Sequence, residues 1–424
     1  IAATGVGGGV TMIGSSGSAA IAANGDAFGH GIELNFVEVL ANGGPIYLEG
    51  KTGNSTKAGI ALSGRAGVLN NKIYFGARAV NPTGVTAMVS TSSSPITLVA
   101  DSIIQNTTHT SEFSTTGAIV MKPLNNDFAP SFNNLGMNMG TAASSITFGK
   151  DGNNGPITVG QSLSAGSITL KGGVVTASTA LLTNTIVPRA GPITVIATTS
   201  FTTTSTATTA LDSDILITTD TLSIGASSAL KVGLPTGANL AAQNTAAIGA
   251  IEIKNFNSAR PVRIGAAVSG MLSVAAADLA KLQAKFLRIG SSTAGPVIIN
   301  KPLTIDGGGQ VTIDSGDRGT VMMLDASNAV IRGIHLTGSG DSHDSDDSCL
   351  DVRGNHNTIE NLELDNCLFG LDLKQSNNNI IRGNSIRSKD RELGVRGDGL
   401  RLWYSNDNLI EKNKIIESSD MVAW

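Results

Sequence analysis

A short strand motif that returns at regular spacing constrains the fold of this chain more than any other feature. The motif is x-Ile-x-x-x-x-Ile/Leu, and its anchor isoleucines are 28, 22 and 29 residues apart, at Ile331, Ile359, Ile381 and Ile410. A second strand type returns at residues 350–352, 371–373, 400–402 and 421–423. Such short strands cannot bury a face alone, but stacked coils with strands about 4.8 Å apart can. The spacing predicts a coil of 21–22 residues with two insertions.

Three asparagines precede anchor isoleucines by two positions, at Asn357, Asn379 and Asn408. Asparagines at the same place in successive coils can form a ladder of amide hydrogen bonds at a tight corner. A propeller or a sandwich would not require this register. The chain is therefore predicted to be all-β and to form a single-stranded parallel β-helix (a β-solenoid), with about 20 coils if 424 residues are divided by 21.

Composition excludes several other classes of protein. Charged residues make up 15% of the chain and the net charge is −4, which gives no global field to attract nucleic acid. No apolar run reaches 18 residues, so no transmembrane segment is expected. Residues 301–424 carry 33 charged side chains and the first 300 carry 29. We expect a neutral Gly/Ser/Thr-rich part over 1–296 and an acidic part over 297–424, with one continuous core.

The neutral part repeats a Gly-Pro or Ser-Pro pair followed by alternating strand residues. Because proline cannot donate to a strand ladder, each pair is expected to begin a strand at a corner. The pairs end at Pro45, Pro95, Pro156, Pro192 and Pro296. One segment has helical spacing instead: Leu279, Leu282 and Phe286 share a face, so a short helix is expected near 274–286, capped by Ser273.

Segments 302–309, 331–334 and 397–405 resemble a superfamily of right-handed β-helices. That superfamily holds carbohydrate-binding and sugar-hydrolase domains and the periplasmic accessory proteins of nitrous oxide reductase maturation. The resemblance implies a right-handed coil. The short helix, Leu287-Arg288-Ile289-Gly290 and the Gly-Pro strands resemble repeats of filamentous-haemagglutinin-type surface proteins, which are secreted β-helical adhesins. The secretion domain of such proteins is not visible here, so the chain is expected to be a segment of something longer.

Candidate chemistry lies in the two insertions, 338–348 and 388–398, which are predicted to face one another across two coils. The sequence of the first insertion favours a solvated acidic loop. The alternative is that this loop binds Ca²⁺ through carboxylate oxygens, with Asp341, Asp344, Asp346 and Asp347 as ligands. If the chain were an enzyme, the acid and base groups would come from Asp344, Asp346, Asp347, Arg391 and Arg396.

A stacked ion pair is expected for the outward column of Asp351, Asp372 and Arg401. Candidate ligand-binding residues are His343, Trp403 and Tyr404, although Trp403 is equally expected to stack on Trp424.

Isolated histidines and two cysteines carry weaker signals. Of His30, His109, His335 and His356, His335 is best placed to be a ligand, because it is an outward strand residue near the acidic insertion. Cys349 and Cys367 lie in consecutive coils; two free thiols are favoured, and a disulfide stays open.

These features predict a structural or adhesive β-helix, extracellular or at the cell surface, rather than an enzyme. Its partners would be other copies of itself, a longer parent chain or glycans, and its cofactors none or Ca²⁺. The first alternative is a carbohydrate-active lyase or hydrolase. The second is a periplasmic accessory protein that docks a metalloenzyme partner.

Overall fold

The structure is a computed structural model of the chain. It describes residues 1–16, 29–35, 37–53, 57–63, 72–76, 93–105, 110–183, 191–204, 207–211, 213–233, 249–257, 260–265, 271–284, 286–290, 297–299 and 302–423. His109, Pro296 and Trp424 lie outside these residues. Two compact units are present: Ile1–Ile217 with Ile224–Gly249 and Gln283–Lys285, and Thr218–Ser223 with Ala250–Leu282 and Phe286–Trp424. Strands β19 (Ile215–Thr219), β20 (Leu222–Ile224) and β25 (Leu282–Gln283) contain points where the chain passes between the units.

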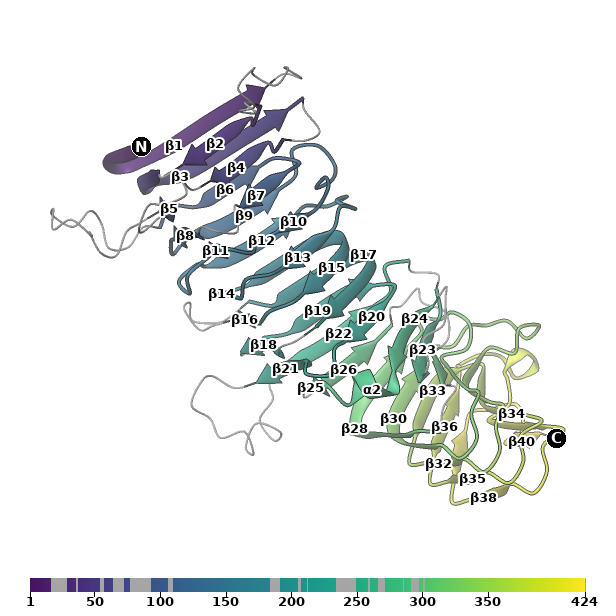
Figure 1. The fold of residues 1–424 in the computed structure, drawn as a ribbon. Coiled ribbons are helices and arrows are strands. Elements are labelled where there is room, and N and C mark those ends of the chain that lie inside the picture. Colours follow the sequence, from purple (N-terminus) through teal and green to yellow (C-terminus); the bar gives the residue numbers. More distant parts are fainter. Residues whose placement is uncertain are drawn as a thin grey trace. The chain divides into compact units, whose positions relative to one another are not determined.

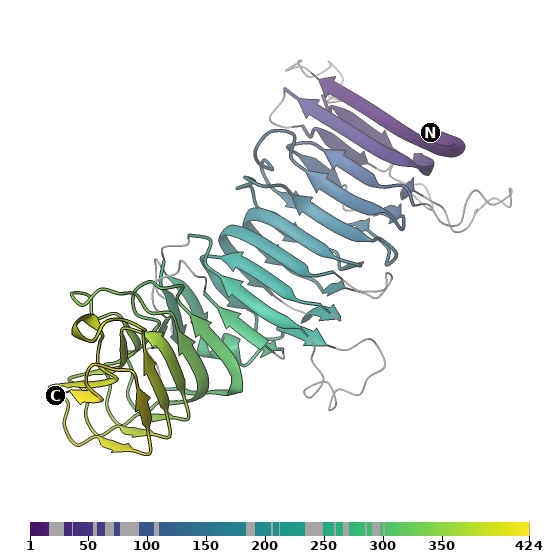
Figure 2. The same cartoon turned by 180° about the vertical axis from the view of Figure 1, so that it is seen from behind.

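Unit 1 is built from parallel strands, which stack as successive coils (Figures 1 and 2). Its main sheet contains β1 (Ala2–Ser16), β3 (Glu38–Thr52), β5 (Lys72–Gly76), β6 (Ile96–Val99), β8 (Thr110–Ser114), β9 (Ala118–Lys122), β10 (Phe132–Asn133), β11 (Met137–Asn138), β12 (Ser145–Gly149), β13 (Ile157–Val159), β15 (Ile168–Ala177) and β17 (Ile193–Thr203). A second sheet holds β2 (Ile32–Asn35), β4 (Ile60–Ser63) and β7 (Ile103–Gln105). A third includes β14 (Leu163–Ala165), β16 (Leu181–Thr183), β18 (Ala207–Leu211) and β21 (Ala229–Gly233).

A column of buried isoleucines fixes the register of unit 1. Each one directly partners the next in adjacent coils, and each is fully buried, in the order Ile46, Ile96, Ile119, Ile146, Ile168 and Ile193. Alternation along each strand then turns the next residue outward. The predicted Ile-in, Thr-out pattern is confirmed at Ile168 and Thr169, where Ile168 is fully buried and Thr169 is partly exposed.

Two details of the neutral part differ from prediction. Partnered residues along this column are separated by 22 to 50 positions, so a coil here is longer than 21 residues and the figure of about 20 coils is too high. Pro45 does not begin a strand, since it lies inside β3 beside the irregular pairing of Gly8 with Asn42 and Gly43. Pro95, Pro156 and Pro192 do precede strands, as predicted.

Unit 2 has two parallel sheets of eight strands. One contains β24 (Leu272–Ala275), β23 (Val262–Gly265), β27 (Val297–Ile299), β29 (Met322–Leu324), β31 (Ser348–Val352), β34 (Phe369–Lys374), β37 (Leu400–Trp403) and β40 (Val422–Ala423). The other contains β28 (Thr304–Asp314), β30 (Val330–Thr337), β32 (Thr358–Glu360), β33 (Glu363–Cys367), β35 (Ile380–Arg382), β36 (Ser385–Ser388), β38 (Leu409–Glu411) and β39 (Lys414–Ile416). In addition, β22 (Ala250–Lys254) pairs with β26 (Phe286–Ile289).

The predicted register of unit 2 is confirmed at the anchor isoleucines, which partner one another through all four coils. It is wrong by one residue at the last coil. Leu400 partners Val422 and not Met421, whose side chain is exposed. Residues 421–423 contain no charged side chain, so the sequence does not show which of the three faces outward.

The predicted asparagine ladder is present. Asn379 Oδ1 accepts a hydrogen bond from the Asn357 backbone N–H at 2.8 Å, and Asn408 Oδ1 accepts one from the Asn379 N–H at 2.8 Å. A second ladder, which was not predicted, joins Asn384 to Asn413 through the Asn384 N–H at 3.0 Å. These amides satisfy buried backbone donors at the corners, which would otherwise destabilise each turn.

The helix expected near 274–286 is reduced to α2, which spans Ala276–Leu279, and Ser273 lies in β24 and does not cap it. Leu282 and Phe286 begin strands instead, because pairing with neighbouring coils overrides a weak helical propensity. A 3₁₀ turn, η1, covers Leu393–Val395. Among the described residues, no helix is long and apolar enough to cross a membrane.

The preference for two free thiols is wrong. Cys349 of β31 and Cys367 of β33 form a disulfide, with their Cα atoms 5.5 Å apart. The bridge joins the two sheets of unit 2 beside the first insertion.

Candidate functional site

The two insertions of unit 2 lie against each other, as predicted. The first separates β30 from β31, and the second separates β36 from β37. His343 Nε2 lies 3.0 Å from the Val395 carbonyl oxygen, and Arg391 donates a hydrogen bond to Asp341. These contacts join residues about fifty positions apart in the sequence and form one corner over β31, β34 and β37.

A buried lysine holds the base of this corner. The Lys389 side chain is 6% exposed, and its Nζ lies 3.0 Å from Asp317 Oδ1 and 3.1 Å from Asp341 Oδ1. The hydrogen bond from Lys389 lowers the pKa of the Asp317 carboxyl below its ordinary value. The corner is therefore fixed by ion pairs between the insertions and the loop that follows β28.

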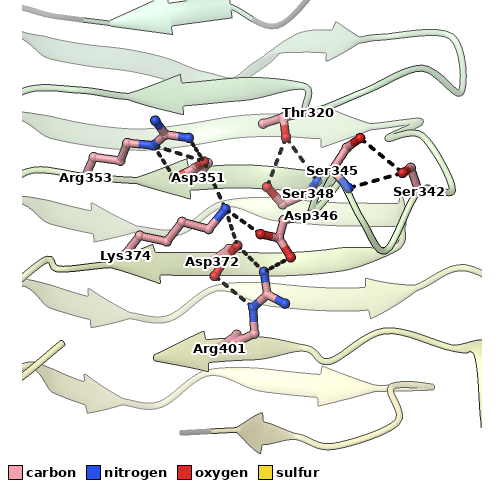
Figure 3. Close-up of polar contacts among 10 residues, drawn as sticks. All are labelled: Thr320, Ser342, Ser345, Asp346, Ser348, Asp351, Arg353, Asp372, Lys374 and Arg401. Atoms are coloured by element: carbon pink, nitrogen blue, oxygen red, sulfur yellow. Dashed lines mark hydrogen bonds and ion pairs between the residues drawn. The ribbon is translucent and has the colours of Figure 1, made fainter. Parts of the chain in front are cut away.

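Beneath the first insertion lies a group of alternating charges, here called the charged cluster (Figure 3). Asp351, Asp372 and Arg401 are direct partners in β31, β34 and β37. Lys374 lies two residues after Asp372 on the same face of β34. The cluster consists of Asp346, Asp351, Arg353, Asp372, Lys374 and Arg401.

Distances within the charged cluster show that each carboxylate is paired. Arg401 Nη2 lies 2.5 Å from Asp372 Oδ2 and 2.7 Å from Asp346 Oδ1. Lys374 Nζ lies 3.1 Å from both Asp372 Oδ2 and Asp346 Oδ2, and 3.6 Å from Asp351 Oδ2. Arg353 Nη2 completes the set at 2.9 Å from Asp351 Oδ2. The predicted stacked ion pair is confirmed, and the network is larger than expected.

The electrostatics of the cluster follow from burial and pairing. Burial acts to raise the pKa of Asp346, but hydrogen bonds from Arg401 and Lys374 outweigh it and lower that pKa overall. Burial acts to lower the pKa of Lys374, and the charges of Asp351 and Asp372 outweigh it and raise that pKa. The charged forms of Asp346 and Lys374 are therefore each favoured by their neighbours.

The local backbone explains why the first insertion can close over this cluster. Asp346 adopts a left-handed conformation with φ of 53°, which aspartate tolerates better than most residues. Gly340 is required for the tight approach, because a Cβ there would lie 2.1 Å from Asp347 Oδ2. Asp347 is buried and accepts the Ser342 backbone N–H at 2.9 Å, so it holds the loop.

The remaining predicted site residues engage different partners and do not form one group. Asp344 is exposed. Arg396 donates a hydrogen bond from its Nη2 to the carbonyl oxygen of Arg391, over 2.6 Å. Asp341, Asp346 and Asp347 each have different partners, as described above. Trp403 and Tyr404 are exposed by 57% and 75%, with their rings edge to face 5.4 Å apart.

Three residues of the corner were not predicted from the sequence to belong to the site. Lys374 and Lys389 could have been found only from the register that places them beside aspartates of neighbouring coils. Asp398 is the third: burial is the main cause that raises the pKa of its carboxyl. Among the described residues, one group of three or more His, Cys, Asp or Glu residues has its ligand atoms within 4.8 Å of one another, and it consists of His335, Glu363 and Asp365.

Unit 1 carries a separate groove of about 510 Å³, lined in part by Lys51, Lys57, Asp101 and Asn125. Asp101 Oδ1 accepts the Asn125 backbone N–H at 2.7 Å. The groove thus brings two lysines and a carboxylate that is engaged by Asn125 to one place.

Comparison with known families identifies part of unit 2. Residues 319–422 match the family described as "Right handed beta helix region". The match and the parallel strands support a right-handed β-helix, and they fit a surface or carbohydrate-active β-helix protein. Searches of the curated proteins and of the solved structures found no match to this chain.

Proposed function

We propose that this chain is a structural or adhesive segment of an exported β-helix protein. Its partners would be further copies or the rest of a longer parent chain, together with surface glycans. The observation that carries the proposal is the mutual neutralisation of the charged cluster, in which three carboxylates face three cations. A general base must be accessible to substrate, yet two of the three carboxylates are buried: the Asp372 side chain is 0% exposed and that of Asp351 is 3% exposed.

Two further features support export and adhesion. The Cys349–Cys367 disulfide is typical of oxidising compartments outside the cytosol. Trp403 and Tyr404 offer exposed aromatic surface beside the corner, and such rings can stack on the apolar faces of sugars. Affinity would then come from many shallow contacts along repeated coils, because multivalent binding needs no deep pocket.

A carbohydrate-active enzyme is the second candidate, and Asp398 is the observation that favours it. Its raised pKa, caused mainly by burial, is the property of a general acid, and Arg401, whose charge acts on Asp398, could neutralise a uronate. This candidate requires Asp398 to be reached by substrate in the corner.

One experiment separates the two. The purified chain is incubated with acidic polysaccharides, and cleavage is followed through new reducing ends and unsaturated uronates. In parallel, binding to immobilised glycans and to cell surfaces is measured. We expect binding without cleavage, with binding weakened by Trp403→Ala. Phe256→Ala, which removes an exposed aromatic ring elsewhere, should leave binding unchanged. Cleavage that disappears in Asp398→Asn would overturn the structural proposal.

A further inference from the structure

One face of unit 2 gathers an imidazole and two carboxylates. His335 of β30 directly partners Glu363 of β33, and Asp365 follows Glu363 by two residues. Because side chains alternate along a strand, all three project from the same outward face. Leu364, between Glu363 and Asp365, and its partner Leu336, next to His335, are fully buried and anchor the two strands to the core.

The donor atoms are already close together. His335 Nε2 lies 2.9 Å from Asp365 Oδ1, and the ligand atoms of all three residues lie within 4.8 Å of one another. Ligands around a first-row divalent ion sit about 2.0–2.2 Å from the metal, so cis ligand atoms are about 3 Å apart. Small side-chain rotations would therefore suffice to close this group around an ion.

The surroundings hold the group in place and keep it accessible. The side chains of His335 and Asp365 are 30% and 38% exposed, so an ion can enter from solvent. The charge of Arg387 acts on Asp365, but the guanidinium itself is bound to Glu417, with Arg387 Nε 2.6 Å from Glu417 Oε2. The disulfide at Cys367 fixes the end of β33 two residues after Asp365. Rigid strands of this kind favour a preorganised site.

We propose that His335, Glu363 and Asp365 form a binding site for a divalent transition-metal ion of the zinc class. The chemistry of the donors selects this class, because Ca²⁺ and Mg²⁺ prefer all-oxygen ligands and an imidazole suits Zn²⁺ and its neighbours. Three protein ligands leave at least one coordination position open to water or to a ligand oxygen. This site is separate from the charged cluster and from the aspartates of the first insertion that were considered for Ca²⁺.

The test is a titration of the full chain, freed of metal with a chelator, with Zn²⁺ followed by calorimetry. We expect one ion bound per chain and no comparable binding of Ca²⁺. His335→Asn, Glu363→Gln and Asp365→Asn should each weaken Zn²⁺ binding at least about tenfold. Co²⁺ in place of Zn²⁺ should give visible absorption bands that are lost in the His335→Asn variant.

The matched control is His356→Asn, which removes an exposed imidazole of the same unit outside the group. Asparagine is chosen because His356 has φ of 56°, a conformation that asparagine tolerates. This variant should bind Zn²⁺ as the parent chain does. Absence of saturable binding in the parent chain would overturn the site, and so would unchanged binding in both His335→Asn and Asp365→Asn. Glu363 is exposed, so Glu363→Gln keeps the test decisive if either of the other variants fails to fold.

Discussion

Arg401 stands directly beside Asp372 in the parallel register of β37 and β34, and its Nε donates to Asp372 Oδ1 at 3.0 Å. Lys374 reaches the same carboxylate from within β34. The Asp372 side chain, which is fully shielded from water, thus contacts one cation from its own strand and one from the next coil. The same two cations attach the first insertion to the stacked coils, because Asp346 of that insertion also forms ion pairs with both of them.

The first prediction concerns this buried carboxylate. Asp372→Ala leaves Arg401 and Lys374 without their common partner, and breaking a buried ion pair by removing one member costs about 3–5 kcal/mol. We expect a loss of that size in the free energy of unfolding of unit 2, measured with urea. Asp151→Ala is the control, since Asp151 pairs with Lys171 while 87% exposed, and its removal should change the unfolding free energy far less. Equal effects of the two substitutions would contradict the structural role of the cluster.

The second prediction concerns pH. The folded-state pKa of Asp346 is lowered from 3.8, so its stabilising contribution is complete above that value and is lost as the pH falls through the lower folded pKa. Asp398 behaves oppositely. Its folded-state pKa is raised from 3.8, so its ionisation destabilises the folded state once the pH exceeds that value.

Two variants measure these signs. Asp398→Asn should stabilise the fold at neutral pH, and this gain should vanish below about pH 3.8. Asp346→Asn should destabilise it at neutral pH, and this loss should shrink at the same acid end. The measurement is the urea midpoint of each variant across the pH range. A destabilising Asp398→Asn at neutral pH would show that the carboxylate is needed in its charged form.

The third prediction concerns the asparagine ladder. Asn379→Ala removes the oxygen that accepts the buried Asn357 N–H, and leaving a buried donor unsatisfied costs about 1–3 kcal/mol. We expect a loss of that order in unfolding free energy. Asn406→Ala is the control, because Asn406 contributes its backbone N–H to the neighbouring coil and its side chain is exposed. If both variants unfolded alike, the ladder would not be a source of stability.

The sequence predicted what depends on period. Ile331 and Ile359 become partners because every coil must return an apolar residue to the same inward place, and the asparagines follow the same period. It could not predict contacts made by side chains that cross coils. Lys374 lies beside Asp346 only because a 338–348 loop of particular backbone shape closes over β34. The helix predicted near 274–286 is largely replaced by strands, because Phe286 pairs with Ala250 of β22, and helical spacing in the sequence does not reveal such a partner.

The fourth prediction concerns the disulfide, which spacing alone did not decide. Cys349 and Cys367 are 18 residues apart in the sequence. Closing a loop of that length lowers the conformational entropy of the unfolded chain and so stabilises the folded state by about 3 kcal/mol. The double variant Cys349→Ser with Cys367→Ser should lose that much, measured by urea unfolding, and reduction of the parent chain should have the same effect. Protein made in an oxidising compartment should show no thiol reactive under denaturing conditions before reduction, and two afterwards. Two reactive thiols before reduction would restore the free-thiol interpretation, and with it remove one support for export, because the bridge is what links this part of the chain to an oxidising environment.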